Sequence, residues 1–217
     1  MSTAEALLTA APASVQRVET SEALAAIQRP DCSAAVWHRA PVPGLAPWLE
    51  GLDPATLPRA RFVMRPEKVR QAMTDILDGA ALPEDAHRAA LIDDVTALAD
   101  RFATLMEAPY LRVRLDVITT NACRRFHIDV VTARLVCTYM GTGTQYGLSA
   151  DGAEPEHIHT VPTGAPILLR GTLWPVTPKS GLLHRSPPIE GTGETRLVLV
   201  LDPIFDLDDA LDETMLH

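Results

Sequence analysis

The hydrophobic pattern of the chain changes its period near residue 110. Before this point the clearest pattern is helical, with apolar residues at steps of three and four: Leu91, Val95, Leu98, Phe102 and Leu105. From 111 to 117 the odd positions are apolar and the even positions are charged, which is the alternation of a half-buried strand. The sequence therefore predicts helices first and strands afterwards, an α+β chain.

Shorter elements are expected ahead of the long helix. They are a helix over 22–27, a strand over 33–38, a short helix near Trp48 and an amphipathic helix over 66–79. Ser21 is placed to cap the first of these, and Pro66 to open the last. Residues 1–20 are rich in small residues and are expected to form a flexible lead-in.

Short strands separated by glycines and prolines are expected in the rest of the chain. They are predicted over 125–131, 133–139, 157–161, 166–171, 182–185 and 195–201. Such a series indicates a β-sandwich or barrel of the jelly-roll type. The expected organisation is one domain, in which a helical part over 21–109 packs on a metal-binding jelly-roll core over 110–205. An acidic tail over 206–217 follows.

Length and charge exclude several classes of protein. A chain of 217 residues that is 47% hydrophobic can bury a sizeable core. Its formal net charge of −9 argues against general nucleic-acid binding, which needs clustered basic residues. No apolar run is long enough to span a membrane, and no basic region precedes the first apolar residues. The cytoplasm is therefore the expected location.

The three cysteines, Cys32, Cys123 and Cys137, are odd in number and far apart. Since no C-x-x-C pair occurs, we expect reduced packing residues rather than zinc or redox groups. Cys123 lies four residues before His127, but along a strand this spacing is too long for both to bind one ion.

The residues with the clearest chemistry are His127 and Asp129. On a strand, side chains two positions apart share a face, so this imidazole and this carboxylate would converge. His184 is the candidate for a third ligand, because the intervening chain is long enough to return beside the first pair. Two histidines and one carboxylate make the facial triad that holds Fe(II) and leaves its other positions open.

Arg196 adds a candidate anion-binding group. It opens the last predicted strand and shares a face with Val198 and Val200. An arginine on a mostly apolar face needs an anionic partner, and its planar fork matches a carboxylate. If the strands over 182–185 and 195–201 form a hairpin, Arg196 stands near His184, which places a carboxylate clamp beside a metal.

This set of residues resembles the Fe(II)/2-oxoglutarate-dependent oxygenase superfamily, over roughly the C-terminal half of the chain. The resemblance implies a double-stranded β-helix of jelly-roll, cupin-like form. It further implies Fe(II) held by His127, Asp129 and His184, and the cosubstrate 2-oxoglutarate bound through its distal carboxylate by Arg196. The expected protein is a dioxygenase, an oxidoreductase that hydroxylates a substrate still to be identified. Tyr139 is a candidate to line the cosubstrate pocket.

Longer motifs resemble the bacterial family catalogued as domain of unknown function 1826 (DUF1826). They are Phe126-His127-x-Asp129, Arg134-Leu135-x-Cys137-Thr138-Tyr139-x-Gly141-x-Gly143-Thr144, Gly171-x-x-Trp174-Pro175 and Leu183-His184-Arg185-Ser186-Pro187-Pro188. This resemblance runs along most of the chain. It implies no activity, and at most an association with zinc-responsive gene neighbourhoods.

One alternative is a cupin-like metal-binding protein without oxygenase chemistry, which would serve in zinc or iron handling. His157 and His159 share a face of a predicted strand, and with His184 they would form an all-histidine zinc site.

Another alternative is a structural or partner-binding module without metal. In that case His127 and Asp129 are only a hydrogen-bonded pair, and Arg196 pairs with Glu194 or Asp202. A related protein that holds a metal without turnover is also compatible with the sequence.

Overall fold

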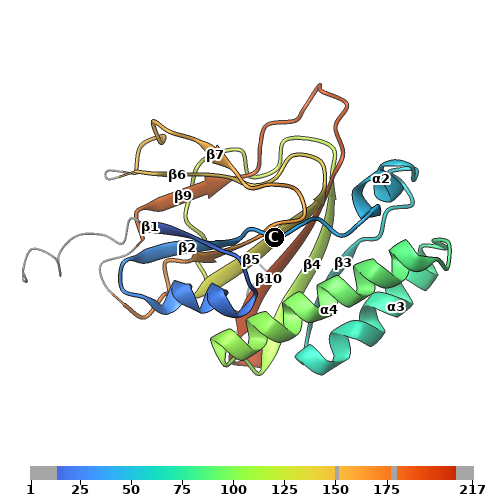
Figure 1. Ribbon diagram of the computed structural model, residues 1–217, viewed down its shortest axis with the longest axis horizontal. Coiled ribbons are helices and arrows are strands. Elements are labelled where there is room, and N and C mark those ends of the chain that lie inside the picture. The colour runs from blue at the N-terminus through green and yellow to red at the C-terminus, as the bar shows by residue number, and fades with distance from the viewer. Residues whose placement is uncertain (1–13, 150–151, 177–179, 209–217) are drawn as a thin grey trace, which may run out of the picture.

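Two β-sheets dominate the computed structural model, which describes residues 14–149, 152–176 and 180–208 (Figure 1). The strands of the larger sheet are β1 (Ser14–Val18), β2 (Cys32–Trp37), β3 (Ala60–Met64), β4 (Tyr110–Ile118), β5 (Ala133–Met140), β8 (Pro166–Arg170) and β10 (Arg196–Ile204). Those of the smaller sheet are β6 (Gln145–Leu148), β7 (His159–Thr160) and β9 (Leu182–Arg185). With the helices below, they make the mixed α+β chain that the sequence predicted.

The larger sheet has the strand order β1-β2-β8-β5-β10-β4-β3, and the smaller has the order β7-β6-β9. Neighbouring strands are antiparallel, apart from the parallel pair β1 and β2. In chain order, the extended segments after β4 alternate between the two sheets, so residues far apart in the sequence come to face one another across the space between them.

The helices are α2 (Leu45–Glu50), α3 (Val69–Gly79) and α4 (Ala86–Met106), with 3-10 helices η1 (Glu22–Gln28) and η2 (Pro66–Lys68). α4 begins where Asp85 accepts hydrogen bonds from the backbone N–H groups of His87 and Arg88, both at 2.9 Å. It ends at Glu107, whose φ of 52° is left-handed. Figure 1 shows α3 and α4 side by side.

Both faces of the larger sheet are buried, and each has its own core. The helix-side core joins the apolar face of α4, including Leu91, Val95 and Phe102, to strand residues such as Leu199. The inter-sheet core lies on the other face and consists of Ala34, Val36, Val136, Tyr146, Val161, Ala165, Ile167, Leu169, Leu182, Val198 and Val200. β10 serves both cores, because its side chains alternate between the two faces.

Two predictions about the strands are wrong, and one strand was missed. The segment 125–131 is an irregular loop with one isolated β-bridge, not a strand. β9 and β10 do not form a hairpin, because β9 pairs with β6 while β10 lies between β4 and β5. β6 was not predicted at all. Its glycine and its position between two turns hide the alternation in a strand of only four residues.

The N-terminal part is less helical than expected. β1 occupies residues that were assigned to the lead-in, and β2 and β3 belong to the same sheet as β4 and β10. Residues 1–13 and most of the acidic tail, 209–217, lie outside the described residues. In the part that is described, no helix combines the length and the apolar character needed to cross a membrane.

Candidate metal centre

His127 is positioned by one β-bridge to His184. The backbone N–H of each residue donates to the carbonyl oxygen of the other, both at 3.0 Å. The loop therefore continues the small sheet beyond β9 for a single pair, and this is enough to set the two imidazoles side by side, with ring centroids 4.6 Å apart. The carbonyl oxygen of Arg125 lies 2.8 Å from Nδ1 of His127, which orients the ring and leaves Nε2 free to face Asp129.

The backbone at Asp129 is held by the chain that follows β8. The N–H of Thr172 donates to the carbonyl oxygen of Asp129 at 2.9 Å, and the N–H of Leu173 donates to that of Val131 at 3.1 Å. Gly171 makes this approach possible, because a Cβ atom there would lie 1.9 Å from the Val131 carbonyl oxygen. Hydrogen bonds between the Asp129 loop and the loop after β8 thus hold this segment in place of the strand that the sequence predicted.

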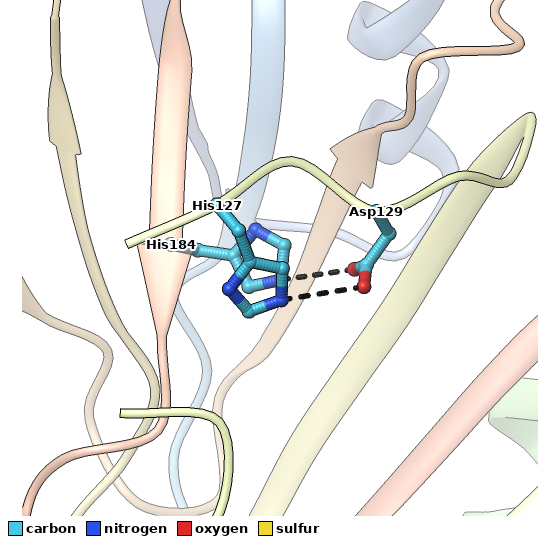
Figure 2. A group of neighbouring side chains, drawn as sticks. All are labelled: His127, Asp129 and His184. Atoms are coloured by element: carbon cyan, nitrogen blue, oxygen red, sulfur yellow. Dashed lines mark ion pairs between the residues drawn. The ribbon is translucent and has the colours of Figure 1, made fainter. Parts of the chain in front are cut away.

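The three candidate ligands converge, as Figure 2 shows. Nε2 of His184 lies 2.9 Å from Oδ2 of Asp129, and Nε2 of His127 lies 3.5 Å from Oδ1. The candidate ligand atoms of the group all lie within 4.8 Å of one another. The three residues that the sequence singled out are therefore brought together, although two of them were expected on a strand that the structure does not form.

This geometry suits a metal ion. Donor atoms in neighbouring positions of an octahedral ion lie about 3 Å apart when each bond is about 2.1 Å long, close to the separations found here. Oδ2 of Asp129 is buried and is assigned no hydrogen-bond partner among the described residues, although Nε2 of His184 lies 2.9 Å from it. A buried polar atom without a partner is costly, and a cation between the two histidines would satisfy it.

The charges of the site also suit a metal. Burial alone would raise the pKa of Asp129, but His127, His184 and Arg134 hold that pKa well below its usual range, so the carboxylate is charged at neutral pH. Burial lowers the pKa of His184, while contact with Asp129 raises the pKa of His127. At least His184 is thus a neutral imidazole near pH 7, the form that binds metals.

Arg134 is a site residue that sequence reasoning missed. It lies at the start of β5, where its guanidinium forms an ion pair with Asp129 and another with Asp202. The signal was present, because Arg134 is charged within the otherwise apolar run from Ala133 to Val136 and follows Asp129 by only five positions.

Arg196 lies at the beginning of β10, with only 1% of its surface exposed. Its Nε donates to the carbonyl oxygen of Thr142 at 2.6 Å, and its Nη1 donates to Oγ of Ser186 at 3.2 Å. Neither expected carboxylate pairs with it: Asp202 binds Arg134 instead, and Glu194 binds Thr142. Arg196 is therefore a buried cation that forms no ion pair with any described carboxylate.

Tyr139 lies away from this site. It belongs to the helix-side core, and its hydroxyl donates to Oδ2 of Asp94 on α4 at 2.7 Å. The expectation that it lines a pocket beside the metal is corrected, because Tyr139 points to the opposite face of the larger sheet. Tyr146 occupies the inter-sheet core, where it pairs with His184 across β6 and β9.

The all-histidine zinc site is not assembled among the described residues. His159 pairs with Tyr146 on the side away from His184, and its ring stacks on the tyrosine with centroids 5.3 Å apart. His157 and His159 are both exposed and belong to no metal-binding group with His184. Cys123 is also exposed and lies outside the triad.

A cleft of about 830 Å³ opens one strand away from His184. Its walls come from β1, from β6 and from the segment leading into β7, and include Arg17, Tyr146, His157 and His159. Tyr146 therefore has the cleft on one side and the candidate ligand His184 on the other.

Two solved structures share the fold of this chain. One is a dioxygenase for auxin oxidation from rice, with 13% identity, a TM-score of 0.53, and coverage of 90% of this chain and 85% of that chain. The other is dioxygenase for auxin oxidation 1 from Arabidopsis thaliana in its binary complex with 2-oxoglutarate. It shows 8% identity, a TM-score of 0.53, and coverage of 90% and 94%. At these identities the likeness concerns the fold alone.

No curated protein matches the chain significantly. A family model does match, over residues 18–202, and it is described as a protein of unknown function, DUF1826. The matched range contains the triad, Arg134 and Arg196. The chain therefore belongs to the DUF1826 family.

Proposed function

We propose that this protein is an Fe(II)/2-oxoglutarate-dependent oxygenase that hydroxylates a second substrate. The observation that carries the proposal is the combination of a candidate metal-binding triad, with His184 buried and His127 and Asp129 half-buried, and a buried arginine without a carboxylate partner among the described residues. Among the described residues, Oδ2 of Asp129 lacks a hydrogen-bond partner and Arg196 lacks a carboxylate. Fe(II) with 2-oxoglutarate supplies a partner for both.

The order of the strands supports a double-stranded β-helix. From β4 onward, the segments lie in the larger sheet (β4), the smaller (the His127 bridge), the larger (β5), the smaller (β6 and β7), the larger (β8), the smaller (β9) and the larger (β10). This alternation is the topology expected of a jelly roll with its ligands inside. It puts His184 on β9 and Arg196 on the next strand, although the two strands are not hydrogen-bonded partners.

His127, Asp129 and His184 would hold the iron, and Arg196 would bind the distal carboxylate of 2-oxoglutarate with its planar fork. When bound, iron and 2-oxoglutarate supply the oxidation: O₂ and 2-oxoglutarate are consumed, succinate and CO₂ form, and one oxygen atom enters a C–H bond of the substrate. The apolar side chains of the inter-sheet core exclude water around the cosubstrate.

The cleft beside Tyr146 is the proposed entrance for the substrate. Across the larger sheet, Arg17 is in register with Val36, Ile167, Val136 and Val200 in turn. Val200 lies four residues beyond Arg196, or roughly 13 Å along the strand. The cleft and the arginine therefore lie apart from one another, which leaves separate places for cosubstrate and substrate.

The test is an anaerobic titration of the apoprotein with Fe(II) and 2-oxoglutarate, followed by the visible metal-to-ligand charge-transfer band. We expect a band in the wild type, no band in Asp129→Ala, and a band in Arg196→Ala only at much higher 2-oxoglutarate. His38→Ala, which changes an exposed histidine outside the triad, is the matched control and keeps the band.

Two other outcomes separate the alternatives. Bound metal without a band in the wild type would favour a cupin-like protein for zinc or iron handling. No bound metal at all would reject the triad and favour a module without metal.

A further inference from the structure

The two oxygens of the Asp129 carboxylate have different surroundings. Oδ1 forms an ion pair with Nη1 of Arg134, whereas Oδ2 is buried without a hydrogen-bond partner among the described residues. His184 Nε2 lies 2.9 Å from this second oxygen. A metal ion bound between the two histidines and Asp129 would therefore find Oδ2 of Asp129 already directed toward it.

The orientation of Arg134 is itself fixed by Asp202. Nε of Arg134 donates to Oδ1 of Asp202 at 2.6 Å, and Nη2 donates to Oδ2 at 2.9 Å. Because the guanidinium is planar and rigid, docking this edge on Asp202 determines where the remaining nitrogen, Nη1, points. That nitrogen reaches Asp129. A lysine has one nitrogen on a flexible stem and cannot reproduce both contacts.

The support for this pair comes from three neighbouring strands. Arg134 lies on β5, Asp202 on β10 and Arg114 on β4, and Nη2 of Arg114 also lies 3.2 Å from Asp202. Asp202 is 1% exposed, and both arginines pair with it. Asp129, in contrast, lies on a loop without a strand ladder. The sheet can therefore position a ligand that its own loop does not fix completely.

We propose that Arg134, docked on Asp202, is a positioning residue that holds Asp129 as a one-oxygen ligand and sets the metal affinity of the site. This inference rests on the metal-binding part of the proposed function. Arg134 does not bind the metal; it occupies Oδ1, selects one orientation of the carboxylate, and leaves Oδ2 for the ion.

The experiment titrates the full-length apoprotein with Co(II), using calorimetry for affinity and the visible spectrum for coordination. For Arg134→Gln we expect metal binding about 10- to 100-fold weaker than in the wild type, the range typical when a residue that orients a metal ligand is lost. The Co(II) spectrum should also change, because Oδ1 becomes free to bind. Arg134→Lys restores the charge without the fork, so it should remain close to Arg134→Gln.

Arg114→Gln is the matched control. It removes an arginine from the same buried carboxylate, Asp202, but Arg114 makes no ion pair with Asp129. It should keep the affinity and spectrum of the wild type, even if the apoprotein unfolds at a lower temperature. If Arg134→Gln fails to fold, Asp202→Asn is the second variant. It keeps Arg134 and all three ligands but removes the docking edge, so it should also weaken Co(II) binding.

Wild-type Co(II) affinity and spectrum in Arg134→Gln, or in Asp202→Asn if that variant must be used, would overturn the proposal. Equal losses in Arg134→Gln and Arg114→Gln would also overturn it, since general destabilisation would then explain both. These results leave the proposed function intact. Failure of the wild type to bind Co(II) would reject the metal site and the positioning role together.

Discussion

Two arginines, a largely buried one on the helix side of the larger sheet and a buried one on the inter-sheet side, have opposite surroundings. On the helix side, Arg39 meets the carboxylate of Asp94 with both ends of its fork, at 2.6 and 2.7 Å. On the inter-sheet side, Arg196 meets a carbonyl and a hydroxyl but no described carboxylate. The pKa values follow this difference. Burial alone would lower the pKa of Arg39, but Asp94 raises it above the usual value, whereas burial lowers the pKa of Arg196 to about 10.

The network around Arg39 is complete. Nε donates to the carbonyl oxygen of Gly164 at 2.8 Å, and Tyr139 donates its hydroxyl to the same carboxylate of Asp94. A polar network in which every member is paired rigidifies the structure around it. The comparison indicates where to look for function. It is the face on which an oxygen of Asp129 has no hydrogen bond and Arg196 has no carboxylate partner among the described residues.

The largest effect on stability should come from breaking the complete network. Asp94→Ala leaves Arg39 as a buried cation without its carboxylate, so we expect the free energy of unfolding to fall by about 3–5 kcal/mol. The melting temperature should fall by roughly 10 °C, with Co(II) affinity of the folded protein unchanged. Thermal unfolding and calorimetry measure the two quantities. A loss under about 1 kcal/mol would mean that this face is less tightly coupled than its geometry indicates.

An intermediate effect is expected for Tyr139→Phe. This change removes one hydrogen bond to a charged group while Arg39 still pairs with Asp94, so about 1.5 kcal/mol of stability should be lost. Because Tyr139 faces the helices, the 2-oxoglutarate dependence of the charge-transfer band should not change. A weaker affinity for 2-oxoglutarate would contradict this placement and return Tyr139 to the cosubstrate pocket.

The smallest effect on the apoprotein is expected for Arg196→Met. The substitution loses hydrogen bonds, but it also replaces a desolvated cation by an apolar side chain of similar length. The free energy of unfolding should therefore change by less than about 1 kcal/mol. The stabilisation by 2-oxoglutarate should differ sharply between the wild type and this variant. At 2-oxoglutarate 100 times above its Kd, the metal-loaded wild type gains about 2.7 kcal/mol, which the variant lacks. A large loss in the apoprotein would instead make Arg196 a structural residue like Arg39.

Local patterns predicted most of the regular elements. The period of α4 and the alternation in β4 depend only on which side chains face the core, so both were readable. β6 and the pairing of β9 were not readable, because a four-residue strand carries too little pattern and its partners lie far along the chain.

The sequence by itself determined the chemistry of the candidate site: two histidines, one carboxylate and one arginine that an apolar strand would bury. Tertiary structure decided how they meet. The triad depends on one β-bridge, on the close approach at Gly171, and on a guanidinium docked on Asp202 from another strand. It also decided that Tyr139 and Arg196, on adjacent strands, face opposite cores. The physical reason is that residue type sets what a group can bind, whereas long-range pairing sets which groups are left without a partner.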